Sequence, residues 1–224
     1  MMDTSHGAPV TQSVGPVRIW DLPTRLFHWL LAALVAASII AIKLDSLDWH
    51  MRFGYAILAL LLFRLLWGFA GSRHALFASF LRGPRAVTDY LRGRWTATGG
   101  HNPLGALSVI ALLALLTLQA AGGLFANDGS FTEGPLAKLV SGSTSEFIST
   151  WHRRAEYAIY ALIGLHVVAV IYYTTFKSEP LLRAMIHGDR TLPVPPAQDD
   201  LPLRLRALLL LALCAALVTY LATL

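Results

Sequence analysis

Five apolar stretches, separated by polar connections, dominate the chain. They lie near residues 26–44, 53–70, 104–125, 155–176 and 205–224. A transmembrane helix needs about 20 apolar residues to cross about 30 Å of hydrocarbon, and each stretch has that length or nearly so. None alternates apolar and polar residues as a membrane β-strand does. The pattern therefore predicts an all-α integral membrane protein with five transmembrane helices.

Composition agrees with the membrane class and excludes several kinds of redox site. The 224 residues are 55% hydrophobic and only 14% charged, which is too little polarity for a soluble domain of this length. The first apolar stretch follows about two dozen mostly polar residues without a small-residue cleavage site, so it is interpreted as a permanent helix. The single cysteine, Cys214, excludes an intramolecular disulfide, a cysteine-ligated iron–sulfur cluster and covalent haem attachment.

The placement of charge predicts the orientation of the helices. The connection 71–102 holds five arginines and one aspartate, and the segments before the first and the fifth stretch are also basic. On the two opposite connections, basic and acidic residues balance. The positive-inside rule then places the N-terminus in the cytoplasm and the C-terminus in the periplasm of a bacterial inner membrane. Because topology explains the basic loop, lipid is an expected partner and nucleic acid is not.

Four parts are expected along the chain. They are a disordered cytoplasmic tail (1–17), a transmembrane bundle (18–190), a Pro-rich linker (191–204) and an additional transmembrane helix (205–224). Within the basic loop, the stretch "FLRGPRAVTDYLRGR" predicts a short amphipathic helix at the membrane surface. Its apolar residues Phe80, Val87 and Tyr90 are expected to face lipid.

The eight histidines differ in their position along the chain. His6, His74 and His187 lie in polar or basic segments and are expected to be solvated. His101 precedes the third apolar stretch, where we expect a capping or interfacial role, with a place near a quinone or a haem propionate as the alternative. The remaining four lie on or at the edge of membrane helices, where ionisable residues are rare and usually functional. These are His28, His50, His152 and His166.

The depths of these four histidines follow from the direction of each helix. His28 lies near the cytoplasmic end of the first helix, and His50 near the periplasmic end of the second. His152 is also near the periplasmic face, and His166 lies fourteen residues further along the same helix, roughly 21 Å deeper. Fourteen residues make about 3.9 turns, so both point to nearly the same side. We expect two level pairs, His50 with His152 and His28 with His166.

Two imidazole pairs at two depths favour non-covalent b-type haem with two axial histidines per iron. Zinc normally takes four ligands at one place. A proton relay usually includes Asp or Glu, and Glu156 is the one acid within the helix cores. The prediction is two haem b groups per chain, ligated by the four histidines. The alternative is four unrelated polar contacts.

Glycines and arginines near the pairs support a porphyrin. Gly54 lies one turn after His50, where a missing side chain leaves room for the ring. Arg25 and Arg153 lie at the two membrane faces, where haem propionates accept charge-assisted hydrogen bonds, and Arg154 is an alternative to Arg153. Helix packing explains the glycines equally well, and anchoring at the interface explains the arginines. Further glycines of this kind are Gly105, Gly122, Gly123 and Gly164.

Several segments together resemble the bacterial cytochrome b561 family, which includes the di-haem b-type subunit of membrane nickel–iron hydrogenases. They are "VRIWDLPTRLFHWLLA", "WHMRFGYAIL", "RLLWGFAGSRHALF", "HNPLGALSVIALL" and "WHRRAEYAIYALIGLHVVAV", and they span about residues 17–188. The resemblance implies a four-helix haem bundle and electron exchange with a quinone pool, with ubiquinone as the candidate quinone. The family's haem ligands correspond to His28, His50, His152 and His166. The fifth helix departs from the usual four-helix core.

Three functions remain in competition at this point. The leading hypothesis is an electron carrier between a periplasmic partner (a c-type cytochrome, or a dehydrogenase or hydrogenase subunit) and quinone or another acceptor. The second is a superoxide-oxidising quinone reductase, which a basic funnel of Arg52, Lys138, Arg153 and Arg154 would favour. The third is a haem-free membrane anchor for a partner complex. An electron-transfer subunit is expected, with quinone oxidoreductase activity and a homodimer left open.

Overall fold

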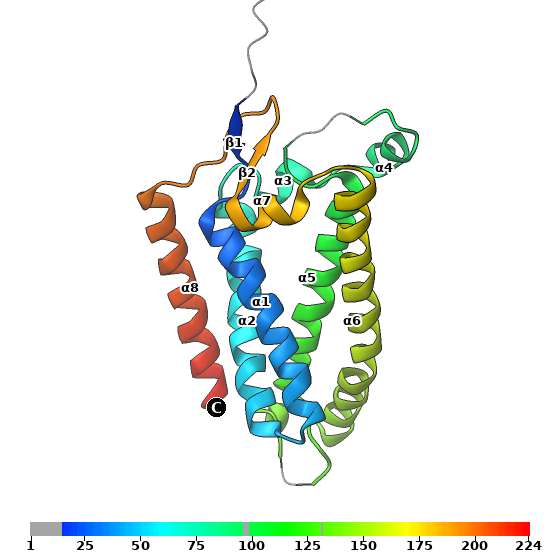
Figure 1. Cartoon of the computed structure of the whole chain (residues 1–224). Coiled ribbons are helices and arrows are strands. Elements are labelled where there is room, and N and C mark those ends of the chain that lie inside the picture. Colours follow the sequence, from blue (N-terminus) through cyan, green and yellow to red (C-terminus); the bar gives the residue numbers. More distant parts are fainter. Residues whose placement is uncertain (1–14, 96–98, 131) are drawn as a thin grey trace, which may run out of the picture.

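The structure is a computed structural model that describes residues 15–95, 99–130 and 132–224. Within these residues, five helices are long and apolar enough to cross a membrane. They are α1 (Leu22–Lys43), α2 (Leu47–Ala70), α5 (Pro103–Gly123), α6 (Gly142–Phe176) and α8 (Leu201–Ala222) (Figure 1). The predicted all-α membrane architecture is therefore confirmed.

Local sequence sets the starts of α1 and α5. The Asp21 side chain accepts a hydrogen bond from the backbone N–H of Thr24 at 2.6 Å, and a proline follows in the first turn of α1. Asn102 caps α5 in the same way, accepting from the N–H of Gly105 at 2.7 Å. A side-chain acceptor at the cap and a proline in the first turn are favourable because the first N–H groups of a helix lack internal partners.

Four of the long helices surround one interior. The short turn at residues 44–46 makes α1 and α2 antiparallel neighbours, α2 packs on α5, and α5 packs on α6 (Figure 1). Buried apolar side chains from all four helices meet in one core. The arrangement places α1 and α2 opposite α6, which is the geometry that facing side chains on these helices require.

The fifth helix packs on the outside of this bundle against α2 (Figure 1). It begins at Leu201 under an Asp200 cap, so residues 201–204 of the predicted linker belong to the helix. Ala207 and Cys214 are buried in the core shared with α2. Small side chains at such positions allow two helices to approach closely. The additional helix therefore packs directly against the bundle, although a Pro-rich segment precedes it.

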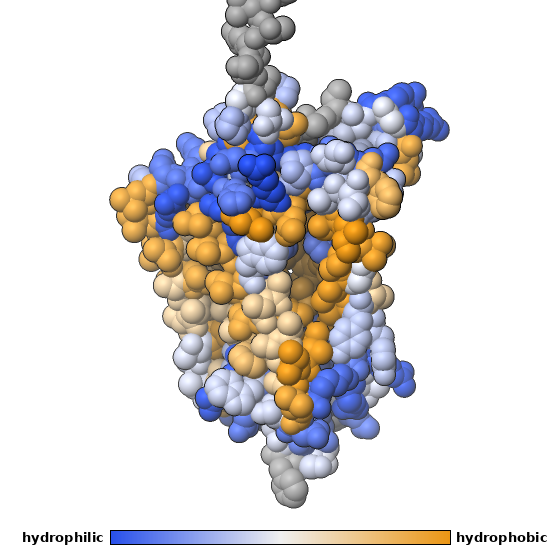
Figure 2. Space-filling view, in the orientation of Figure 1, coloured by the Kyte–Doolittle hydropathy of each residue, from blue (hydrophilic) through white to orange (hydrophobic). Residues whose placement is uncertain are grey.

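The two ends of the bundle differ, and we call them the strand end and the far end (Figure 1). The strand end carries β1 (Pro16–Arg18), β2 (Asp189–Thr191), α3 (Phe77–Phe80), α4 (Pro84–Leu91) and α7 (Leu181–His187). The far end carries the turn 44–46, the 3-10 helix η1 (Ala137–Leu139) and Leu224. Figure 2 shows an apolar belt between two more polar ends, as a membrane protein requires.

The predicted tail and the predicted surface helix need correction. Residues 1–14 lie outside the described residues, but Pro16 pairs with Thr191 in the antiparallel β-ribbon and so is not disordered. The surface helix exists as α4, but Phe80 lies in the separate α3, before the Gly-Pro at which α4 begins. Phe80 is 2% exposed and packs against His101 with ring centroids 4.8 Å apart, so it does not face lipid.

Long-range contacts hold the strand end together. Asp199 accepts from Arg204 at 3.0 Å and from the backbone N–H of Leu22 at 3.1 Å, which ties α8 to the start of α1. Burial raises the pKa of the Asp199 carboxyl, but these hydrogen bonds and the charges of Arg204 and Arg18 outweigh burial, so its pKa lies below the ordinary value. The carboxylate is thus ionised and joins the start of α1 to the start of α8, two segments that lie far apart in the sequence.

His74 is also part of this structure rather than a solvated residue. It is 4% exposed, and its Nε2 lies 3.0 Å from the carbonyl oxygen of Pro195, to which it donates. Burial lowers the pKa of His74, while the hydrogen bond to Pro195 opposes that change and Arg73 adds to it. The expectation of a solvated role was wrong because the covering segment is more than a hundred residues away in sequence. His187 is exposed as expected, and His6 lies outside the described residues.

Candidate haem sites

The structure brings the four membrane histidines together in the predicted pairs. His50 of α2 faces His152 of α6, with ring centroids 6.1 Å apart. His28 of α1 faces His166 of the same α6, with ring centroids 6.3 Å apart. α6 therefore supplies one imidazole to each pair, fourteen residues apart, while α1 and α2 each supply one partner.

These separations fit one metal ion held between two imidazoles. A bond from an imidazole nitrogen to a metal is about 2 Å long, and the ring centre lies roughly 1 Å behind that nitrogen. Two axial imidazoles on opposite sides of one iron thus place their centroids about 6 Å apart, close to the separation in both pairs. Within the described residues, no group of three or more His, Cys, Asp or Glu side chains is placed to hold a metal ion. The donor set fits haem iron and does not fit zinc.

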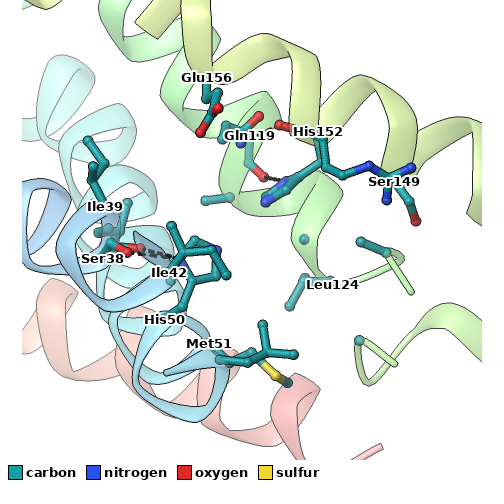
Figure 3. Close-up of a pocket in the computed structure, with 18 of the residues that line it drawn as sticks. Ser38, Ile39, Ile42, His50, Met51, Gln119, Leu124, Ser149, His152 and Glu156 are labelled. Carbon is teal, nitrogen blue, oxygen red and sulfur yellow. Dashed lines mark hydrogen bonds between the residues drawn. The ribbon is translucent and has the colours of Figure 1, made fainter. Parts of the chain in front are cut away.

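Backbone carbonyls orient both rings of the His50–His152 pair. The Nδ1 atom of His50 lies 3.0 Å from the carbonyl oxygen of Ser38, and Nδ1 of His152 lies 3.0 Å from that of Gln119 (Figure 3). When each Nδ1–H donates to its carbonyl, Nε2 carries the lone pair that binds a metal. This outer hydrogen bond is the usual partner of a metal-ligating histidine.

A cavity of about 410 Å³ opens between His50 and His152. Figure 3 shows both imidazoles directed into it. Its walls are mainly apolar, with Val35, Ile39, Ile57, Leu116 and Ile159 among them. Cofactor sites in proteins are concave and mostly apolar, with volumes of about 300–1,000 Å³. The cavity thus has the character of a buried cofactor site.

Glycines contribute to this cavity in two ways. No atom lies within 4 Å of the position where a Cβ on Gly54 would stand, so this glycine leaves open space beside His50. A Cβ on Gly123 would lie 3.3 Å from Cε1 of His152, so Gly123 allows α5 to approach that ring. Of the other three predicted glycines, Gly122 lies near His152, Gly105 sits at the α5 cap, and Gly164 has open surroundings.

The mouth of the cavity is polar and carries both signs of charge. Arg153 lines it together with Asp128 and Glu156. Of the other cations expected to form a basic funnel, Arg52 lies over the Trp49 ring at 5.3 Å, and neither it nor Lys138 nor Arg154 is among the lining residues. Of the four cations of the predicted basic funnel, only Arg153 is therefore among the lining residues, and the carboxylates Asp128 and Glu156 line the same cavity.

The surroundings of the His28–His166 pair are different. Nδ1 of His28 is buried, and in the part of the chain that the structure describes it has no hydrogen-bond partner. Arg25, predicted to meet a propionate, donates from Nη1 to the carbonyl oxygen of Ile186 at 2.6 Å and lies 4.0 Å from Asp199. Its Nε is also buried, with no partner among the described residues. Most of the Arg25 guanidinium therefore contacts groups of the strand end.

Two residues near this pair were missed or undervalued from the sequence. Arg64 of α2 is 3% exposed and donates from Nη2 to the carbonyl oxygen of Ala75 at 3.1 Å. His101 packs on Trp20 with ring centroids 4.7 Å apart, and burial, with a smaller effect of Arg64, lowers its pKa to about 3. The signal that could have found Arg64 is its spacing of fourteen residues from His50, the same spacing that relates the two α6 histidines.

A helical membrane bundle with facing imidazole pairs and no cysteine attachment site has the character of a b-type cytochrome. The model of the prokaryotic cytochrome b561 family matches residues 19–188, and the chain belongs to this family. The resemblance found in the sequence motifs is thereby confirmed, and haem b is the cofactor that this class implies. The match ends before α8 begins.

Two curated relatives agree with this assignment. The chain is 25% identical over 226 residues to a probable Ni/Fe-hydrogenase B-type cytochrome subunit of Cupriavidus necator, covering 84% of the chain and 93% of the relative. It is 20% identical over 211 residues to a protein of the same description from Bradyrhizobium diazoefficiens, covering 78% of the chain and 85% of the relative. The similarity thus extends over most of each protein.

Proposed function

We propose that the chain is a di-haem electron carrier. His50 and His152 are the axial ligands of one haem b, and His28 and His166 are those of a second. The observation that supports this proposal most is the pair of ring separations, 6.1 and 6.3 Å, each suited to one iron between two imidazoles. The absence of a cysteine attachment motif makes both haems non-covalent.

The chain's own residues bind, orient and shield the cofactor. Bound haem supplies reversible one-electron chemistry. The carbonyls of Ser38 and Gln119 hold the rings of His50 and His152 in one tautomer, which keeps Nε2 available. The apolar wall formed by α1, α2, α5 and α6 excludes water from the space between the rings. Because α6 carries one ligand of each pair, a single rigid helix fixes the distance between the two sites.

The orientation of the sites follows from charge. The positive-inside rule places the strand end, with its basic loop 71–102, in the cytoplasm of a bacterial inner membrane. The N-terminus is then cytoplasmic, and Leu224 at the far end is periplasmic. The His50–His152 pair lies near the periplasmic face, and the His28–His166 pair near the cytoplasmic face.

Electrons pass between a periplasmic redox partner and a quinone near the cytoplasmic pair, with ubiquinone as the candidate. Relatives described as hydrogenase cytochrome subunits support a hydrogenase or another dehydrogenase subunit as the partner, with a c-type cytochrome as the alternative. The mixed charge at the cavity mouth, where Arg153 has Asp128 and Glu156 beside it, supports a carrier over a superoxide oxidase.

Spectroscopy of the purified protein in lipid nanodiscs tests this function. We expect a low-spin b-type spectrum after dithionite reduction and rapid reoxidation by a soluble ubiquinone analogue. The double variant His28→Ala/His166→Ala should keep one haem but lose rapid reoxidation, because the haem nearest the quinone is gone. High-spin haem in the unaltered protein would contradict axial ligation by two histidines. Equal reoxidation rates in the two proteins would contradict the proposed path.

A further inference from the structure

Arg64 lies on α2, and the proposed electron-carrier function assigns it no role. It follows His50 by fourteen residues, or about 3.9 turns, so it lies on nearly the same side of α2. That side faces the bundle interior, because His50 meets His152 there. The rise of roughly 21 Å along the helix takes Arg64 from the level of one histidine pair to that of the other.

The guanidinium of Arg64 is buried without a matching anion. Its Nη2 donates to the Ala75 carbonyl at 3.1 Å, and its Cζ lies 5.1 Å from the centre of the Phe77 ring. Nη1 has no partner among the described residues, where no carboxylate lies within ion-pair distance of Arg64. An unpaired buried charge is unfavourable, and a charge-assisted hydrogen bond removes most of that cost.

Asp21 acts electrostatically on Arg64, but its carboxylate already accepts hydrogen bonds from other groups. Asp21 is fully buried and accepts hydrogen bonds from the Thr24 backbone N–H, the Trp67 indole N–H at 3.3 Å and the Ser72 hydroxyl. It caps α1 and joins α2 to the loop that follows. Asp21 offsets part of the arginine's charge at a distance but leaves Nη1 without an acceptor.

Two more buried nitrogens at the level of the His28–His166 pair lack partners. Nδ1 of His101 and Nδ1 of His28 have none among the residues that the structure describes. His101 lies within electrostatic reach of Arg64, His28 and His166 at once. Three groups able to donate hydrogen bonds therefore gather beside the His28–His166 pair. An anionic acceptor placed there would satisfy the guanidinium and at least one imidazole.

We propose that Arg64, assisted by His101, binds a propionate carboxylate of the haem held by His28 and His166. This inference rests on the proposed function, since it requires haem at that pair. A propionate is anionic and reaches outward from the porphyrin edge, and guanidinium binds carboxylate with two parallel hydrogen bonds. A quinone oxygen is a neutral acceptor and would leave the buried positive charge of Arg64 uncompensated.

Infrared spectroscopy with labelled haem tests the proposal. Cells fed δ-aminolevulinate labelled with ¹³C at its carboxyl carbon make haem labelled in its propionates. In Arg64→Gln we expect both haems to remain, the labelled carboxylate bands of the redox difference spectrum to shift, and the midpoint potential of the His28–His166 haem to fall. The other haem should be unchanged. The potential falls because a positive charge beside the iron favours the reduced form.

Arg206→Gln is the matched control. The guanidinium of Arg206 lies 5.7 Å from the centre of the Trp67 ring, so it is near the same part of α2, but it belongs to an exposed face of α8. This substitution removes an equal charge and should leave the labelled bands in place. Arg64→Lys keeps the charge but not the two parallel donors, so the bands should shift while most of the potential is retained.

Unchanged labelled bands in both Arg64 variants would overturn the proposal. If the bands are unchanged and reoxidation by quinone slows, Arg64 acts on the quinone, and the proposal is overturned as well. If Arg64→Gln fails to insert, the band shift in Arg64→Lys decides. These failures differ from failure of the proposed function, because a wild-type protein without haem at His28 and His166 would give no second set of labelled bands.

Discussion

The His50–His152 pair and the His28–His166 pair have nearly equal ring separations, 6.1 and 6.3 Å, but unlike surroundings. Both rings of the first pair meet a backbone carbonyl through Nδ1, and the cavity between them has a mouth of mixed charge. In the second pair, Nδ1 of His28 has no partner among the described residues, and the buried Arg64 lies nearby.

This difference shows that the helices determine the geometry of the histidine pairs, whereas neighbouring groups determine their electrostatic surroundings. Helix direction and the fourteen-residue spacing give both pairs the same ligand geometry. A carbonyl acceptor makes an imidazole more basic and favours oxidised iron, whereas a nearby guanidinium favours reduced iron. For the two proposed haems we therefore expect different potentials, with the lower one at His50 and His152.

Substitution of single histidine ligands should change the two pairs most strongly. We expect His50→Ala and His152→Ala to lose the same haem, and His28→Ala and His166→Ala to lose the other, because each iron needs both of its imidazoles. Haem content should fall from about two to about one per chain in each variant. A redox titration of the four proteins identifies which component is lost. Loss of the same component from the His28 and His152 variants would show that the pairing is wrong.

Filling one cavity should affect one haem only. A leucine in place of Gly54 would project into the open space beside His50, so Gly54→Leu should lose most of the haem held by His50 and His152. The other haem should be retained. Ala158→Leu, on an exposed part of α6 away from the cavity, is the matched control and should keep both. Full retention of both haems in Gly54→Leu would mean that the porphyrin lies elsewhere.

Removal of α8 should lower the stability of the protein and should affect both histidine pairs alike. None of the residues lining the His50–His152 cavity comes from α8, and that helix carries no histidine. A chain ending at Asp200 keeps the hydrogen bond from Leu22 to Asp199, loses the one from Arg204, and should retain both haems. Its unfolding midpoint should fall by about 2–4 °C for each kcal/mol of lost packing on α2, measured by haem release on heating. Haem loss from an inserted chain would place α8 in the binding core.

Acidification should weaken the strand end in a way that depends on His74. Since burial lowers its folded pKa, the unfolded state takes up a proton first as pH falls below about 6.5. Stability is therefore full above that pH and declines as the pH falls from about 6.5 toward the lower folded pKa. His74→Gln should make the unfolding midpoint less dependent on pH over this range, while exposed His187→Gln should not. Equal pH dependence in His74→Gln and the unaltered chain would argue against a buried neutral imidazole.

The sequence predicted the helices and the histidine pairs because both follow from periodicity and helix direction. Arg64 was not predicted, although its spacing of fourteen residues from His50 is the same as that between the two α6 histidines. His74 and Phe80 were misplaced. They lie in a basic, polar loop, and their burial depends on segments far along the chain, such as the carbonyl of Pro195. Local patterns carry no information about such contacts.

Haem quantitation on the purified wild-type chain tests the central claim most directly. Acidified acetone should extract all haem, because the chain has no attachment motif, and the pyridine haemochrome assay should give about two haem b per chain. That result follows from two imidazole pairs, each able to ligate one iron. One haem per chain, or haem that stays with the protein after extraction, would contradict it.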